Sequence, residues 1–313
     1  MQNKDLLSVA DLSSEHIRLL ISEAINMKAS GWLSLLNKKT LALMFEKPSL
    51  RTRVSFEMAM RQLGGHCIYL SPAEVGLGKR ESVADVAQVL GRYIDVIAAR
   101  TFSHQTLEIL ASHSPVPVIN ALSDLEHPCQ ALADLLTIYE KKGDFQGLTL
   151  AYIGDGNNVA HSLLLAASLV GMNFNIASPN GYAVQESILS LAKECAAENG
   201  ARIFCTEEPK LAVSGADVVY TDVWTSMGQE AEAEERRRVF ANYRVDTELL
   251  SLARKDTIFM HPLPAHRGEE VAESVLDSLQ SVVFDQAENR MHLQKALLAW
   301  ILGGLDIPLA AHR

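Results

Sequence analysis

The sequence has few cysteines, no excess of basic residues and no long apolar segment, and each absence excludes a class of protein. Its four cysteines are far apart with no C-x-x-C spacing, so neither a zinc ribbon nor a redox motif is expected, and a reducing compartment fits best. The net charge of -10 argues against broad nucleic-acid binding, which needs a basic face. The N-terminus lacks the features of a signal peptide, and the apolar runs are too short to span a bilayer. We therefore expect a cytoplasmic protein without nucleic-acid or membrane partners.

The chain contains two successive series of apolar strand segments that alternate with helical segments. At 313 residues it is long enough for two domains. This alternation predicts an α/β fold of two similar domains, each a parallel sheet flanked by helices, with the active site in the interdomain cleft. We expect domains at 1–140 and 141–285, with the terminal helix 286–313 packing back on the first. The expected strands are 40–45, 67–70, 96–100 and 116–120, then 148–153, 174–177, 201–204, 218–221 and 257–260.

One strand-loop-helix junction has the features of a site for a compact anion. Pro48 interrupts the loop, Ser49 and Thr52 are good helix-capping residues, and the following helix is expected from residue 54 to 63. The first N–H groups of a helix have no acceptor within it. Together with Arg51 and Arg53 they suit a phosphate. The alternative is a capped surface helix with solvated arginines.

Polar residues follow most of the expected strands, where ligands of open α/β sheets bind. Taken singly, Arg100 could be a strand-ending charge, His127 a helix cap and Asp222 a turn residue. Their common placement favours one shared small-molecule site. These residues are Ser49 to Thr52, Arg100, His127 to Gln130, Asn157 and Asn158, Asp222 with Ser226 to Gly228, and His261 to Arg267.

Two further segments have simpler explanations than a ligand site. Gly154-Asp155-Gly156 follows a strand and opens a helix, as in a dinucleotide-binding fingerprint. However, Val159 fills the third glycine position, and the next strand ends in Ser178-Pro179 rather than an acidic residue, which argues against a nicotinamide enzyme. The mixed acidic and basic run from 230 to 238 is most simply a solvated helix.

Six motifs resemble the ornithine carbamoyltransferase family, and they follow the family's order across nearly the whole chain. Agreement of six motifs in register is hard to reconcile with chance. The motifs are Ser49-x-Arg51-Thr52-Arg53, Arg100-Thr101-Phe102-Ser103-His104, His127-Pro128-Cys129-Gln130, Gly154-Asp155-Gly156-Asn157-Asn158, Asp222-x-x-x-Ser226-Met227-Gly228 and Leu263-Pro264-Ala265-His266-Arg267-Gly268.

The resemblance implies transfer of a carbamoyl group from carbamoyl phosphate to the side-chain amine of L-ornithine, giving citrulline and phosphate. It implies a homotrimer and requires no metal or organic cofactor. The implied catalytic residues are Arg51, Thr52, Arg100, His127 and Gln130. The implied carbamoyl phosphate-binding residues are Ser49, Leu50, Arg51, Thr52, Arg100, His127, Pro128, Cys129, Gln130, Pro262, Leu263 and Arg290. The implied ornithine-binding residues are Asn158, Asp222, Ser226 and Met227.

Three positions depart from the family's pattern. Leu50 replaces a usual threonine, Gly76 stands where a glutamine is usual, and Pro262 replaces a cysteine that contacts the ornithine amine. The segment from His261 to Pro264 is instead similar to aspartate carbamoyltransferases. Alternative acceptors are therefore putrescine, an N-modified ornithine or aspartate, and a non-catalytic binding subunit of the same fold is a further alternative.

Overall fold

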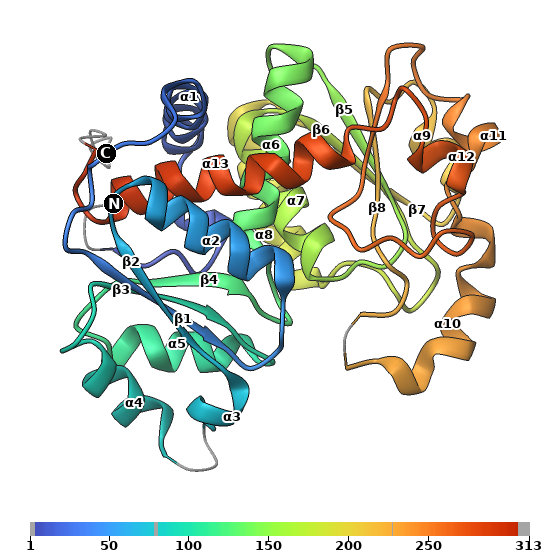
Figure 1. Ribbon diagram of the computed structural model, residues 1–313. Helices are drawn as coiled ribbons and strands as arrows, with labels where there is room; N and C mark the ends of the chain where they lie inside the picture. The colour runs from blue at the N-terminus through green and yellow to red at the C-terminus, as the bar shows by residue number, and fades with distance from the viewer. Residues whose placement is uncertain (1–3, 78–80, 227, 306–313) are drawn as a thin grey trace. The chain divides into compact units, whose positions relative to one another are not determined.

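The computed structural model describes residues 4–77, 81–226 and 228–305 (Figure 1). The chain forms two compact units, Met1–Leu136 with Glu288–Arg313, and Thr137–Ala287. Each unit contains one parallel sheet flanked by helices, so the expected fold class is confirmed. No helix within the described ranges has both the length and the apolarity needed to cross a membrane.

The first unit is built on a four-stranded parallel sheet in the order β2-β1-β3-β4. Side chains alternate between its faces, so Ala42 and Met44 of β1 join Ile97 and Ala99 of β3 in a core under α4 and α5. The strands are β1 (Thr40–Phe45), β2 (His66–Leu70), β3 (Val96–Arg100) and β4 (Val118–Leu122). The helices that begin in this unit are η1 (Val9–Asp11), α1 (Ser14–Ser30), α2 (Leu50–Gln62), α3 (Pro72–Val75), α4 (Val83–Leu90), α5 (His104–His113) and α6 (Pro128–Lys142).

The last helix, α13 (Val283–Ile301), packs against α1 from residue 288 onward. Lys28 Nζ donates to Asn289 Oδ1 at 2.9 Å, and the buried Lys295 Nζ donates to the Met27 carbonyl at 3.1 Å. Burial lowers the pKa of Lys295, and its ammonium donates hydrogen bonds to the carbonyls of Met27 and Gly31 in place of water. These contacts attach the last part of the chain to the first unit.

The second unit has a five-stranded parallel sheet in the order β7-β6-β5-β8-β9. Its strands are β5 (Thr149–Ile153), β6 (Asn173–Ala177), β7 (Ile203–Thr206), β8 (Val218–Thr221) and β9 (Ile258–Met260). Its helices are α7 (Asn158–Val170), α8 (Glu186–Asn199), α9 (Pro209–Val213), η2 (Glu230–Glu232), α10 (Ala233–Val239), η3 (Ala241–Tyr243), α11 (Thr247–Leu250) and α12 (Glu273–Leu276).

The strand orders define where a ligand should bind in each unit. The order reverses beside β1, between β2 and β3, and again beside β5, between β6 and β8. At such switch points the loops leaving two neighbouring strands diverge and leave a crevice at their carboxyl ends. We therefore expect ligand-binding residues on the loops after β1 and β3, and on those after β5 and β8.

Candidate active site

The N-terminus of α2 in the first unit places two hydroxyls beside a cation. Ser49 is the N-cap: its Oγ accepts from the Thr52 N–H at 3.4 Å and donates to Thr52 Oγ1 at 3.0 Å. Arg290 Nη2 also donates to Thr52 Oγ1, at 2.8 Å, so this buried hydroxyl can give its own proton to a ligand. The Leu50 side chain is 76% exposed, so only its backbone can contribute.

Arg53 does not join this group, contrary to the sequence-based expectation. Its Nε donates to Glu57 Oε1 at 2.8 Å, four residues along α2, and its guanidinium lies over the Tyr69 ring. The helix also begins at residue 50 rather than near 54. Arg53 follows Arg51 by two residues, which is about 200° around the helix axis, so the second arginine of the motif points away from the first and toward the surface.

Arg100 is set at the end of β3 by an irregularity in the sheet. Pairing with β4 shifts between Ala99 and Arg100, so that Arg100 pairs with Leu122. Such a bulge re-aims the side chain that follows it. Arg100 is 5% exposed, and its Nε has no hydrogen-bond partner among the described residues.

Arg100, Arg290 and Arg51 are close enough to repel one another. Burial, and after it the nearby charges of Arg290 and Arg51, together lower the pKa of Arg100 to about 10. Burial also lowers the pKa of Arg51. Buried like charges are tolerated where an anion compensates them, so this cluster is suited to phosphate.

The start of α6 supplies neutral polar groups to the same unit. Burial, then Arg290 and Arg100, hold the pKa of His127 well below its usual value, so its imidazole is neutral at neutral pH. Gln130 Nε2 donates to Asp134 Oδ1 at 2.8 Å, while its buried Oε1 has no partner among the described residues. Pro128 is the first residue of the helix, and burial raises the pKa of the Cys129 thiol to about 12, so it stays protonated.

Gly76 has a structural reason to be glycine. It caps the short helix α3 with φ of 51° in the left-handed region, where a side chain is strained. The turn itself therefore disfavours the glutamine that the resemblance led us to expect.

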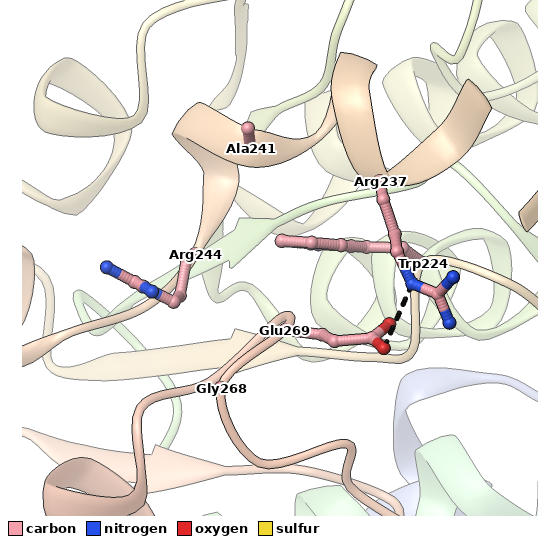
Figure 2. Close-up of a pocket in the computed structure, with 6 residues that line it drawn as sticks. All are labelled: Trp224, Arg237, Ala241, Arg244, Gly268 and Glu269. Carbon is pink, nitrogen blue, oxygen red and sulfur yellow. Dashed lines mark hydrogen bonds and ion pairs between the residues drawn. The ribbon is translucent and has the colours of Figure 1, made fainter. Parts of the chain in front are cut away.

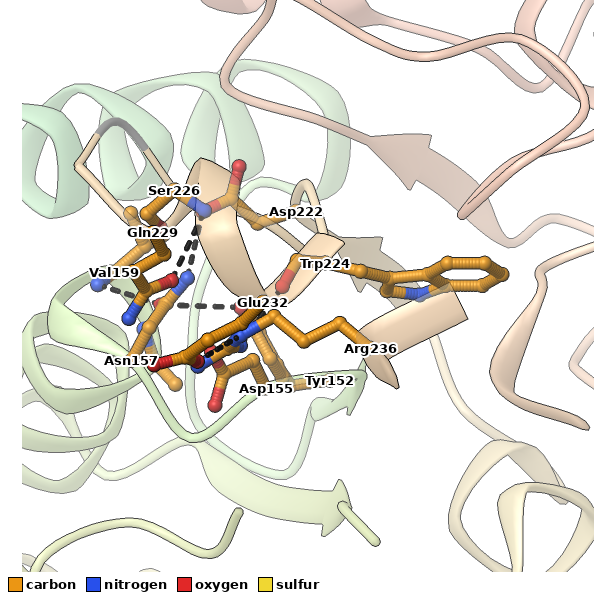
Figure 3. A network of polar contacts seen from close by, with 11 residues as sticks. Tyr152, Asp155, Asn157, Val159, Asp222, Trp224, Ser226, Gln229, Glu232 and Arg236 are labelled. Carbon is orange, nitrogen blue, oxygen red and sulfur yellow. Dashed lines mark hydrogen bonds and ion pairs between the residues drawn. The ribbon is translucent and has the colours of Figure 1, made fainter. Parts of the chain in front are cut away.

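In the second unit, Asn157 and Asp222 meet across the switch point between β5 and β8 (Figure 3). Asn157 Oδ1 accepts from the N–H groups of Val159 and Ala160, at 2.9 and 3.1 Å, and thereby caps α7. Its Nδ2 must then face the other way, and it donates to Asp222 Oδ2 at 2.9 Å. Burial raises the pKa of Asp222, while His261 and Asn157 act in the opposite direction.

Packing within the second unit explains a glycine in the turn after β5. A Cβ on Gly156 would lie 2.3 Å from the Val184 nitrogen, and the Gly156 N–H donates to the Tyr182 carbonyl at 2.8 Å. The glycine is therefore required by a neighbouring segment of the same unit, rather than by a bound pyrophosphate.

The run from 230 to 238 is not fully solvated, because Arg236 is buried. Its Nη1 donates to Asp155 Oδ2 at 2.7 Å and to the Trp224 carbonyl at 2.8 Å (Figure 3). Its Nε donates to Glu232 Oε2 at 3.0 Å. No pattern in the sequence indicates this burial directly, because charges four residues apart are typical of an exposed helix.

The remaining expected contacts of the second unit lie on loops after β5, β8 and β9. Asn158 is the first residue of α7, and the Ser226 N–H donates to Gln229 Oε1 at 3.1 Å. Met227 lies outside the described residues. Pro262 is buried, and Leu263 has φ of 54° while its N–H donates to His261 Nδ1 at 2.9 Å. A non-glycine residue in this left-handed region is uncommon and indicates a tightly held loop.

A separate pocket of about 250 Å³ in this unit lies beside Trp224 (Figure 2). Arg237 Nε donates to Glu269 Oε1 at 3.1 Å, so the pocket contains a neutralised pair. None of the expected site residues lines it, and we assign it no substrate. Its lining residues are Trp224, Arg237, Ala241, Arg244, Gly268 and Glu269.

One group of side chains among the described residues has metal-ligand spacing. Ligand atoms of His266, Glu269 and Glu270 lie within 4.8 Å of one another. Glu270 Oε1 already accepts from the His266 N–H at 2.6 Å and lies 3.2 Å from His261 Nε2, and Glu269 is paired with Arg237. The carboxylates therefore stabilise the loop after β9, and we assign no metal to them.

Comparisons with known proteins agree over both units. Residues 4–140 match the carbamoyl-P binding domain of aspartate/ornithine carbamoyltransferase, and residues 146–301 match its Asp/Orn binding domain. The ornithine carbamoyltransferase of Anoxybacillus flavithermus is 54% identical over 306 residues, covering 96% of this chain and 98% of that protein. The anabolic ornithine carbamoyltransferase of Pyrococcus furiosus is 51% identical over 309 residues, covering 97% and 98%.

Solved structures of the same enzyme also superpose on nearly the whole chain. The ornithine carbamoyltransferase structure from Pyrococcus furiosus has a TM-score of 0.94 at 51% identity and covers 97% of this chain and 99% of that one. The structure from Thermus thermophilus has a TM-score of 0.88 at 46% identity and covers 96% and 100%.

Proposed function

Because this chain belongs to the aspartate/ornithine carbamoyltransferase family, we propose that it transfers the carbamoyl group of carbamoyl phosphate to the side-chain amine of L-ornithine, giving L-citrulline and phosphate. The observation that carries the proposal is the cluster of Arg51, Arg100 and Arg290, whose mutual repulsion a phosphate would relieve. A buried carboxylate, Asp222, is correspondingly suited to the α-ammonium of an amino acid.

We propose that the first unit holds carbamoyl phosphate. Ser49, the backbone of Leu50, and the three arginines bind the phosphate, with Pro128 and Cys129 contributing backbone atoms at the start of α6. Thr52, Arg100 and the neutral His127 donate to the carbonyl oxygen. The buried Gln130 Oε1 accepts from the carbamoyl amide, which satisfies an acceptor that otherwise has no partner in the described chain.

We propose that the second unit holds ornithine. Asp222, kept in place by Asn157, binds the α-ammonium, and Asn158, Ser226 and Met227 bind the rest of the amino-acid end. A diamine such as putrescine has no carboxylate to use these additional donors, so the arrangement favours a free amino acid.

The chemical step follows from these roles. The neutral side-chain amine of ornithine attacks the carbamoyl carbon, and negative charge develops on the carbonyl oxygen. The bond between the carbon and the phosphate oxygen then breaks, and the proton lost by the amine is balanced by the leaving phosphate. Each donor fixed on that oxygen is worth about 3 to 4 kcal/mol of barrier lowering. An alkylamine with a pKa of about 10.4 is roughly one part in a thousand neutral at pH 7, so a cationic, water-poor site favours the reactive form.

Pro262 removes a thiol without removing this machinery. Its backbone carbonyl and that of Leu263 remain available to accept hydrogen bonds from a carbamoyl amide. Because carbonyl polarisation supplies most of the barrier lowering, Pro262→Cys should change kcat by less than about tenfold. An increase on the order of a thousandfold in steady-state turnover would show that the thiol is needed after all.

A product assay tests the proposed function directly. The protein is incubated with carbamoyl phosphate and, in separate reactions, ornithine, aspartate, putrescine and N-acetylornithine, and each carbamoylated product is identified by mass spectrometry. We expect citrulline as the main product. Carbamoylation of aspartate but not ornithine would overturn the acceptor assignment, and no product with any amine would favour a binding subunit.

We further propose a cytoplasmic homotrimer that works in arginine biosynthesis. The relative named anabolic, from Pyrococcus furiosus, supports this direction. Light scattering should give three times the chain mass of 34.3 kDa, and cell fractionation should recover the protein with cytoplasmic markers. A mass of one or two chains would contradict the trimer.

A further inference from the structure

Arg236 connects three separate segments of the second unit. It is 5% exposed, although it belongs to a run of three consecutive arginines. One guanidinium reaches Asp155 after β5, the Trp224 carbonyl after β8, and Glu232 at the start of its own helix (Figure 3). The same guanidinium lies 5.0 Å from the centre of the Tyr182 ring.

The two loops that Arg236 joins are those that carry the proposed ornithine contacts. Asp155 lies in the turn that leads into Asn157 and Asn158. Trp224 lies midway between Asp222 and Ser226. Aromatic packing reinforces the same link, because the Trp224 ring stacks on Phe240 directly after α10, 6.0 Å between centres and 22° between planes.

We propose that Arg236 is a positioning residue for ornithine: by holding Asp155 and the Trp224 carbonyl at once, it sets the spacing of the two acceptor loops. It does not touch the substrate. The proposal rests on the function proposed above and concerns how tightly the acceptor binds, rather than the polarisation of the carbonyl.

The contact between Arg236 and Asp155 is better suited to fixing the geometry of the two loops than to stabilising the fold. Burying an ion pair costs solvation, and apolar residues of similar volume often stabilise a core as well or better. Burial raises the pKa of Asp155 even with Arg236 beside it, which is the sign of that cost. A planar guanidinium fixes the direction of each bond, whereas lysine offers a single point charge. Arginine is therefore suited to holding two oxygen atoms from different loops.

The test compares four single substitutions by steady-state kinetics. Arg236→Met removes the contacts to both loops, and Asp155→Asn weakens the contact to the loop after β5. Arg236→Lys keeps the positive charge but not the planar guanidinium. Arg237→Met is the matched control, because Arg237 is the next residue on α10 but its side chain is 54% exposed and pairs with Glu269. Misplacing binding groups by about 1 Å can cost on the order of a hundredfold. We expect Arg236→Met to raise the KM for ornithine by about ten- to a hundredfold.

Comparison of the two KM values across the variants separates a positioning role from a loss of folding. The KM for carbamoyl phosphate should stay within about twofold of wild type, Arg236→Lys should recover part of the ornithine KM, and Arg237→Met should behave as wild type. A fall in kcat and in melting temperature with an unchanged ornithine KM would overturn the proposal. If Arg236→Met does not fold, Arg236→Lys and Asp155→Asn decide by the same criterion.

Hydrogen exchange provides a readout that does not depend on the proposed function. Backbone amides 155–158 and 222–226 should exchange faster in Arg236→Met or Arg236→Lys than in wild type and Arg237→Met. Unchanged exchange rates in these two segments would show that Arg236 does not hold the two loops in place. Absence of citrulline formation by the wild-type protein would instead overturn the proposed function and leave the exchange result to decide on the positioning role.

Discussion

His127 is suited to the proposed role of a neutral hydrogen-bond donor. Burial, Arg290 and Arg100 all lower the pKa of its ring. The ring is therefore uncharged at neutral pH, and it stays uncharged at the pH near 6.5 where an ordinary histidine gains a proton. A neutral imidazole can polarise a carbonyl by donating a hydrogen bond, without transferring the proton to the carbonyl oxygen. The first prediction is that His127→Ala lowers kcat by a factor on the order of a hundred to a thousand, with a smaller change in the KM for carbamoyl phosphate.

The pH dependence of this variant provides its control. Wild-type kcat should show no ionisation from His127 near pH 6.5, because its folded pKa lies well below that ordinary value. An inflection near 6.5 in the wild-type profile that disappears in the variant would contradict the neutral assignment.

Asp222 should give kcat/KM for ornithine a characteristic pH dependence. Its pKa is raised by burial, so the carboxylate that we propose binds the α-ammonium is lost at a higher pH than for an ordinary aspartate near 3.8. The substrate amine alone gives log kcat/KM for ornithine a slope of one below its pKa of about 10.4. The second prediction is that this slope steepens toward two once the pH falls through the raised pKa of Asp222.

Asp222→Asn is the comparison for that profile. The variant should bind ornithine at least about tenfold more weakly, and its slope should stay at one over the whole range. Activity measured after return to neutral pH separates titration from acid denaturation. Steepening that persists in the asparagine variant would assign the ionisation to another group.

At the scale of elements, the start of α2 combines a helix cap with part of the proposed carbamoyl phosphate site. Ser49→Ala removes the cap of Thr52 N–H and the bond to Thr52 Oγ1. The third prediction is a loss of about 1 kcal/mol of unfolding free energy and a several-fold rise in the KM for carbamoyl phosphate. Denaturant titration and initial rates measure the two effects.

Ser13→Ala is the matched control, since Ser13 caps α1 by accepting from the His16 N–H at 3.2 Å. It should cost similar stability and leave the KM unchanged. Equal KM values for carbamoyl phosphate in the two variants would mean that Ser49 stabilises the helix and does not contribute to binding carbamoyl phosphate.

Strand positions were more predictable from the sequence than the contacts that connect the loops. Apolar runs such as 96–100 must be buried, and a buried run has few alternatives to a strand. Most site residues follow such runs, so Arg100, His127 and Asp222 could be assigned in advance to strand ends. The β4 strand was placed two residues early, because 116–117 are as apolar as the residues that pair.

Arg236 and Arg53 show what local patterns leave out. Both lie on helices four residues from a glutamate, a spacing typical of a solvent-exposed pair. Arg53 forms such a pair with Glu57, whereas Arg236 is buried against Asp155, 81 positions earlier in the chain. Only the tertiary fold brings that carboxylate to the helix, so no spacing within the helix could indicate it.

At the scale of the whole molecule, the charge of the chain and the charge of the site have opposite signs. A net charge of -10 repels an anionic substrate at long range, although salt screens this beyond a Debye length of about 8 Å. Binding must therefore come from the local group of Arg51, Arg100 and Arg290. Such a group lowers the stability of the ligand-free protein and raises that of the complex.

The final prediction is that Arg100→Met leaves the ligand-free protein at least as stable as wild type. Because the folded state lowers the pKa of Arg100 to about 10, carrying its proton costs folding free energy throughout the pH range below that value. Methionine fills a similar space without the charge. Inorganic phosphate should raise the melting temperature of wild type, and stabilisation reaches about 2.7 kcal/mol at a hundred times Kd. In Arg100→Met this rise should nearly vanish.

Arg53→Met controls for the loss of any arginine from this region. Arg53 is exposed and paired with Glu57, so its removal should leave the phosphate response intact. Scanning calorimetry of the three proteins with and without phosphate measures both effects. If Arg100→Met melted well below wild type and still gained the full phosphate shift, then the buried guanidinium would be part of the scaffold, and the anion would have to be held by other groups.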